Sequence, residues 1–256
     1  MADRSSGAFP YSKSSTLCYS ALFHAGRFDD LLAVLALDPQ PYWHDQQWAA
    51  RAMAASGDVD GGVKLMEGLR SRHAPDMALS AVAEQLLLDA GRVDEAYARY
   101  GIQATSANTH IATFRAIVKR YPSIEPSRIL GDLVASTPGE EGKWFATAKT
   151  LKQYDLALAL ARRAPVEPKT LVRAARDHVK NQPAFAMEVA LMALYWMARG
   201  EGYELTGADV GAARDHAAAA AATLGHGGQV SERIAGSVAG DGTAARWVRQ
   251  CLGLSN

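Results

Sequence analysis

A short motif that recurs at near-constant spacing constrains this chain more than any other feature of its sequence. The clearest copy, at Gly91, reads GRVDEAY: a glycine, a polar residue, an apolar residue and an aspartate, followed by small and apolar positions. The six copies, two of them degenerate, begin at positions 26, 57, 91, 122, 152 and 183. Successive starts are 31, 34, 31, 30 and 31 residues apart. A step of this size is typical of a repeat built from two helices.

The motif has a physical reading as the turn between two helices. Gly26, Gly57 and Gly91 each follow a segment of helical apolar spacing, where a helix end favours a residue with left-handed backbone torsions. The aspartate three places later then lies in the first turn of the next helix, near its partly positive end. The motif therefore predicts a first helix, a sharp turn and a second helix.

The flanking sequence supports an all-α chain. Residues 78–89 and 92–100 place apolar side chains at steps of three and four, as helices do. Nine of the prolines fall in inter-helix segments or first turns. Almost no window alternates apolar and polar residues, so strands have little support.

The run from Leu87 to Tyr97, which reads LLDAGRVDEAY, resembles the tetratricopeptide and related helical-repeat families. The resemblance covers about residues 12–200. It departs from the family pattern because the Trp and Gly-Tyr signals of the first helix are not legible and most steps are 30–31 residues. It implies a right-handed α-solenoid of about six to seven helix–turn–helix repeats, following a tail at residues 1–11.

Residues 201–256 are expected to cap the solenoid. The preceding segment 183–199 is apolar on nearly every face, which predicts a helix between neighbouring helices. Thr206 and Asp209 have capping-box spacing, with Asp in place of Glu, ahead of an alanine tract at 217–222 that should pack closely. A last helix near 242–252 should cover the end of the repeats. Its apolar side would carry Trp247, Val248, Cys251 and Leu252.

Composition argues against several classes of protein. The chain has 27 Lys and Arg against 27 Asp and Glu, without the positive excess usual in proteins that bind nucleic acid or anionic membranes. Two cysteines at opposite ends form neither a disulfide framework nor a zinc site. Neither a membrane span nor a secretory signal is legible, and we expect a cytoplasmic protein.

Motifs for catalysis are missing from the sequence. The seven histidines are scattered and form no H-x-x-x-H or H-E-x-x-H pattern. The glycine-rich phosphate loops and the G-x-S-x-G elbow are also absent. We therefore expect no metal, no cofactor and no enzymatic activity.

Two segments are candidate binding surfaces. Tyr42, Trp43 and Gln47 open a predicted first helix, where aromatic rings and an amide could hold an extended peptide; alternatively, Trp43 or Trp48 packs in the core. The second segment is basic. Lys169, Arg173, Arg176 and Lys180 follow each other at steps of 4, 3 and 4, which puts them on one helix face, either to receive an acidic segment or phosphates or simply to face solvent.

The expected function is that of a non-catalytic adaptor or scaffold, which binds a peptide or protein segment in the solenoid groove. Two alternatives stay open: a single-stranded nucleic-acid binder that uses the basic face at 162–180, or a sensor of a peptide or small ligand. A homodimer through the C-terminal helix, with Trp247, Cys251 and Leu252 at the interface, is also a candidate.

Overall fold

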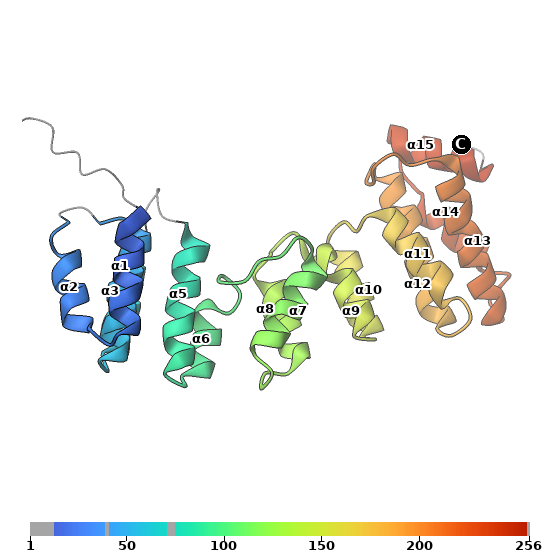
Figure 1. Cartoon of the computed structure of the whole chain (residues 1–256). Helices are drawn as coiled ribbons and strands as arrows, with labels where there is room; N and C mark the ends of the chain where they lie inside the picture. Colours follow the sequence, from blue (N-terminus) through green and yellow to red (C-terminus); the bar gives the residue numbers. More distant parts are fainter. Residues whose placement is uncertain (1–12, 39–40, 71–74, 255–256) are drawn as a thin grey trace, which may run out of the picture. The chain divides into compact units, whose positions relative to one another are not determined.

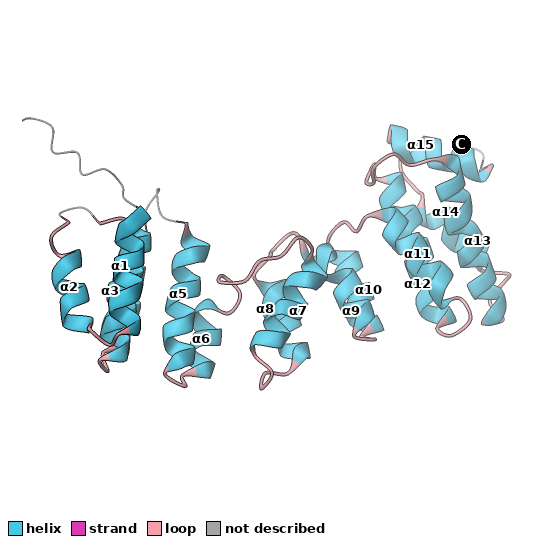
Figure 2. Cartoon of the chain, viewed as in Figure 1, coloured by secondary structure: helices cyan, strands magenta, loops and turns pink. Residues whose placement is uncertain are grey.

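The computed structural model describes residues 13–38, 41–70 and 75–254 (Figure 1). Fifteen α-helices and one short 3₁₀ helix make up its regular structure, and these described ranges contain no strand (Figure 2). The all-α prediction is therefore confirmed. The tail predicted at residues 1–11 lies outside the described residues.

The helices group into two compact units. Unit 1 comprises Met1–Ser106 and Lys119–Tyr121, and unit 2 comprises Ala107–Val118 and Pro122–Asn256. Consecutive helices pack against each other within each unit. No helix in the described ranges is long and apolar enough to cross a membrane.

Unit 1 is built from hairpins of antiparallel helices around a core of aliphatic and aromatic side chains, among them the buried Leu31, Leu87 and Tyr100. Its helices are α1 (Lys13–His24), α2 (Phe28–Leu35), α3 (Trp43–Ala55), α4 (Val59–Gly68), α5 (Asp76–Asp89) and α6 (Val93–Tyr100). The helix α7 (His110–Arg120) follows, and its last residues, with Tyr121, belong to unit 1.

Unit 2 continues the hairpin arrangement and ends in an additional helix. Its elements are α8 (Pro126–Ala135), η1 (Glu141–Trp144), α9 (Phe145–Thr150), α10 (Tyr154–Arg163), α11 (Pro168–His178), α12 (Pro183–Ala198), α13 (Gly207–Thr223), α14 (Val230–Ser237) and α15 (Thr243–Leu252). Three of these helices begin with proline, which fits the first turn because the missing N–H would have no partner there.

The motif glycines turn the chain as predicted. Gly26, Gly57 and Gly91 have φ of +69°, +100° and +75°. After each glycine, the next amide donates a hydrogen bond of 2.8–2.9 Å to a carbonyl five residues earlier, as in a Schellman motif. The weaker copy at Lys152 uses the same geometry, with φ of +59° and a 3.0 Å bond from Gln153 N to Ala148 O.

The two degenerate copies differ from this frame. In the four other copies the second helix begins two residues after the motif start, whereas here the helices begin at Pro126 and at Pro183 itself. A proline ring holds φ near −65°, so Pro122 and Pro183 are unable to adopt the left-handed turn that the frame requires. These two positions therefore do not share the turn geometry of the clear copies.

The C-terminal predictions are largely confirmed. Helix α12 packs against α10, α11, α13, α14 and α15, and ten of its sixteen residues are buried. Thr206 and Asp209 form the expected capping box at the start of α13. The alanine tract is only partly packed, because Ala217, Ala220 and Ala221 are buried but the other three alanines are exposed.

Helix α15 covers its own chain. Ala245 and Val248 are buried where it packs on α12 and α13. Trp247, Cys251 and Leu252 are half-buried, so most of the apolar side expected for a dimer contact is already in use within the chain.

Candidate binding surfaces

The predicted aromatic segment lies at the beginning of α3. Tyr42 precedes the helix, is 59% exposed and stacks on the ring of His44 at 5.5 Å. Trp43 is half-buried, with its ring edge-on to His44 at 6.0 Å. Trp48 instead packs against the core of unit 1, 5.7 Å from the ring of Phe23. The alternative of a core tryptophan thus holds for Trp48, while Tyr42 remains on the surface.

Gln47 does not present a free amide. Its Nε2 donates to the carbonyl of His44 at 2.8 Å, and its Oε1 accepts from Arg51 Nη2 at 3.4 Å. Both ends of the amide are therefore used inside α3. Gln47 contributes to a surface only by helping to hold Arg51.

A hollow of about 240 Å³ lies further along α3, between the C-terminal halves of α3 and α5. Its walls are mainly apolar, and polar side chains stand at its edge. It is lined by Phe23, Arg51, Ala54, Ala55, Val59, Gln85, Leu86, Asp89 and Ala90. Tyr42 and Trp43 do not line it, because they stand about 16 Å away at the other end of α3, given the rise of 1.5 Å per helical residue.

Arg51 is the charged group held most firmly at this hollow. Its guanidinium carbon lies 5.1 Å from the centroid of the Trp48 ring, a cation–π contact. The Gln47 amide contacts its edge. None of the described carboxylates forms an ion pair with Arg51. The arginine is thus oriented, yet its charge is not neutralised within the described chain.

The opposite wall is held by a chain of hydrogen bonds. Arg120 Nη2 donates to Gln85 Oε1 at 2.8 Å, and Gln85 Nε2 donates to Asp89 Oδ1 at 2.5 Å. The hollow therefore carries a guanidinium on one side and a hydrogen-bonded amide and carboxylate on the other. Sequence reasoning missed these residues, although Arg51 and Gln85 each precede a motif glycine by six positions.

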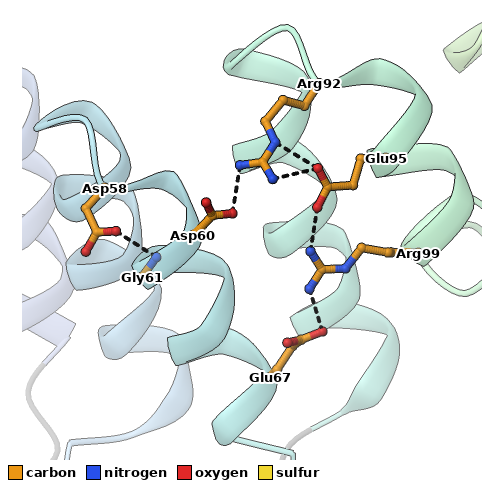
Figure 3. A network of polar contacts seen from close by, with 7 residues as sticks. All are labelled: Asp58, Asp60, Gly61, Glu67, Arg92, Glu95 and Arg99. Atoms are coloured by element: carbon orange, nitrogen blue, oxygen red, sulfur yellow. Dashed lines mark hydrogen bonds and ion pairs between the residues drawn. The ribbon is translucent and has the colours of Figure 1, made fainter.

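A polar network joins α4 to α6 on another part of unit 1 (Figure 3). Arg92 contacts Asp60 at 2.7 Å and Glu95 at 2.6 Å. Arg99 contacts Glu95 at 2.7 Å and Glu67 at 3.0 Å. Four charged side chains of the motif region are thus paired between or within helices. Asp60 was expected to cap its helix, but the cap of α4 is Asp58, which accepts from Gly61 N at 2.9 Å.

The network continues into the core through Tyr100. The Tyr100 hydroxyl donates to Glu67 Oε1 at 2.7 Å. This bond and the bonds from Arg99 lower the pKa of Glu67, while burial and the bond to Glu67 raise the pKa of Tyr100 to about 12. Because its charges satisfy one another, we assign the network to packing of the hairpins and not to a binding site.

The predicted basic face on α11 is only partly available. Lys169 Nζ donates to the carbonyl of Glu204 at 2.8 Å, and Arg176 pairs with Asp177 at 2.9 Å. Arg173 donates to the carbonyl of Lys169 and to Thr170. The helix expected to carry all four cations ends at His178, so Lys180 lies beyond it. The four side chains therefore do not form one continuous helical stripe.

The described residues contain no group of His, Cys, Asp and Glu side chains arranged to hold a metal ion. No protein-family model, curated protein or solved structure matches this chain. Function is therefore argued from the surfaces themselves.

Proposed function

We propose that this chain is a protein–protein interaction module and that the hollow between α3 and α5 receives a segment of its partner. The proposal treats the hairpins as repeats of a tetratricopeptide-like α-solenoid, in which partners bind along the first helices. The observation that carries it is the position of Arg51, stacked on Trp48 at the edge of an apolar hollow. Such an arrangement provides both an apolar contact and a directional polar one.

The size of the hollow favours a side chain of a partner over a free ligand. Small-molecule sites usually enclose about 300–1,000 Å³, and this hollow has about 240 Å³. One apolar side chain would fill it against Ala54, Ala55 and Leu86, while the partner's polar groups would reach Arg51 and Asp89. This argument supports an adaptor more than a small-ligand sensor, and it requires no catalytic step.

The nucleic-acid alternative has weaker support. Of the cations between 162 and 180, Arg162 pairs with Glu188 and Arg176 with Asp177. Lys169 is bound to a backbone carbonyl. Paired cations release fewer counterions and attract phosphates less strongly than free ones do.

The test is affinity purification of the tagged chain from its native host, followed by mass spectrometry, with variants that fill the hollow. Ala55 is exposed and lines the hollow, so Ala55→Trp should block it without disturbing the core. Ala222→Trp places the same side chain at an exposed alanine near the end of α13 and is the matched control. Arg51→Ala removes the oriented cation.

We expect stoichiometric protein partners that survive nuclease treatment, remain with Ala222→Trp and are lost with Ala55→Trp and Arg51→Ala. Partners that bind Ala55→Trp as well as the unmodified chain would show that the hollow is not the site. Loss of all co-purifying material on nuclease treatment would contradict the adaptor function itself.

A further inference from the structure

A stripe of four side chains runs along the exposed side of α12, the otherwise buried helix of unit 2. Glu188, Met192, Tyr195 and Arg199 follow one another at steps of 4, 3 and 4 and so share one face. Three of them are half-buried and Arg199 is exposed. The stripe spans eleven residues, about 16 Å at 1.5 Å per residue. This length corresponds to about three turns of a helix.

The stripe borders a groove of about 310 Å³ between α12 and α14. Its α12 side is formed by Leu191, which is 5% exposed, together with Met192 and Tyr195. The α14 side is low, because a Cβ added at Gly236 would meet no heavy atom within 4 Å. Arg233 and Ser237 complete that side. Methionine is flexible enough to adapt to different apolar partners, so the floor suits a variable apolar side chain.

The charge around this groove is unbalanced. Glu188 is the single carboxylate that lines it, and two guanidiniums share that carboxylate: Arg162 at 3.1 Å and Arg233 at 2.6 Å. At the other end, the guanidinium carbon of Arg199 lies 3.3 Å from the centroid of the Tyr195 ring, and Arg199 donates to the Tyr195 carbonyl. No described carboxylate pairs with Arg199. Three cations therefore face one anion.

We infer that this groove binds an acidic amphipathic helix of a protein partner. Apolar side chains at three- and four-residue steps of that helix would contact Leu191, Met192 and Tyr195, while its acidic residues would approach Arg199 and Arg233. The groove lies between two helices, and the described chain contains no sheet edge to which an extended peptide could add a strand. The site belongs to unit 2 alone and does not depend on the hollow in unit 1.

The test is a selection of random 16-residue peptides displayed on phage against the full-length chain, with counter-selection on the Met192→Glu variant. Enriched peptides should carry several Asp or Glu residues and apolar residues three and four positions apart. The best peptide is then synthesised with a fluorescent label, and its dissociation constant is measured by fluorescence anisotropy. Arg199→Glu and Gly236→Leu should each weaken its binding at least about tenfold, a cost of roughly 1.4 kcal/mol.

Three controls make the result specific. Gly236→Leu fills the groove from an open position of α14, so it tests the site even if Met192→Glu unfolds. Arg246→Glu reverses an exposed charge on α15 and should leave the affinity within twofold. Ala55→Trp, which blocks the hollow of unit 1, should also leave it unchanged, so that failure here is distinguishable from failure of the proposed function.

Two results would overturn the inference. One is a selection without peptides that distinguish the unmodified chain from Gly236→Leu, or with predominantly basic peptides. The other is competition by a 20-nucleotide single-stranded oligonucleotide whose binding is abolished by Arg199→Glu, because the cations would then serve phosphates.

Discussion

The carboxylate of Glu84 is buried in α5 and accepts a hydrogen bond from the hydroxyl of Tyr121, with Glu84 Oε1 and Tyr121 Oη 2.5 Å apart. Arg120 Nε donates to the other oxygen, Glu84 Oε2, at 2.9 Å. Burial and the bond to Glu84 raise the pKa of Tyr121, so its hydroxyl remains a donor throughout the ordinary pH range. The pair joins α5 to the end of α7 within unit 1.

Tyr121→Phe should therefore destabilise unit 1. The substitution keeps the ring but leaves the buried carboxylate with one donor fewer, and hydrogen bonds to charged groups contribute about 1.5–3 kcal/mol. Urea unfolding followed by circular dichroism would measure the change. Tyr203→Phe is the matched control, because Tyr203 is 74% exposed and should show no loss. Equal stability of the two variants would mean that the Glu84 bond contributes nothing.

Lys152→Gly should stabilise the chain. Lys152 has φ of +59°, a conformation that disfavours residues with a Cβ by about 1–2 kcal/mol. Part of that gain is offset because glycine loses more backbone entropy on folding, so we expect a net gain of about 0.5–1 kcal/mol in the free energy of unfolding. Lys149→Gly, inside α9, should instead lose about 1 kcal/mol. Destabilisation by both variants would contradict the shared turn geometry.

Thr206→Ala should weaken the beginning of α13. The Thr206 hydroxyl donates to Asp209 Oδ2 at 2.8 Å and accepts from Asp209 N at 3.4 Å. Loss of such a cap costs about 1 kcal/mol, and the first-turn amides should exchange faster with deuterated solvent. Thr206→Ser keeps the hydroxyl and should preserve both stability and protection. Thr243→Ala, at the exposed start of α15, is a further control expected to have little effect.

Stability should also fall in mild acid because of His110. Its ring lies edge-on to the Trp144 indole at 4.7 Å. Burial, with a smaller contribution from the Lys143 charge, lowers the pKa of His110 below 6.5. The folded state then prefers the neutral ring, so its contribution is complete above the unfolded pKa and is lost as pH falls from about 6.5 through the folded pKa.

His110→Phe keeps a ring against Trp144 but does not titrate. The difference in free energy of unfolding between this variant and the unmodified chain should therefore change between pH 7.5 and pH 5. Titration of the His110 Hε1 proton by nuclear magnetic resonance measures the pKa directly. A value at or above 6.5 would contradict the prediction.

Local interactions explain how much of the fold was predictable from sequence. The turn at Gly91 needs only a residue that tolerates positive φ, and the start of α13 needs only a hydroxyl and a carboxylate three positions apart. Both requirements are met within a few residues, so they are legible without the fold. Where the motif placed proline, at 122 and 183, the same torsion was impossible and the frame shifted.

The sequence by itself determined that the chain is helical, where most of its helices turn, and that α12 is buried. Only the tertiary structure decided which side chains are available for binding. Trp48 entered the core and became the support of Arg51, while Arg233 met Glu188, 45 residues away, and Lys169 met the Glu204 carbonyl, 35 residues away. The physical reason is that side-chain burial and charge pairing depend on neighbours brought together by packing, whereas backbone torsions and helix caps depend on adjacent residues.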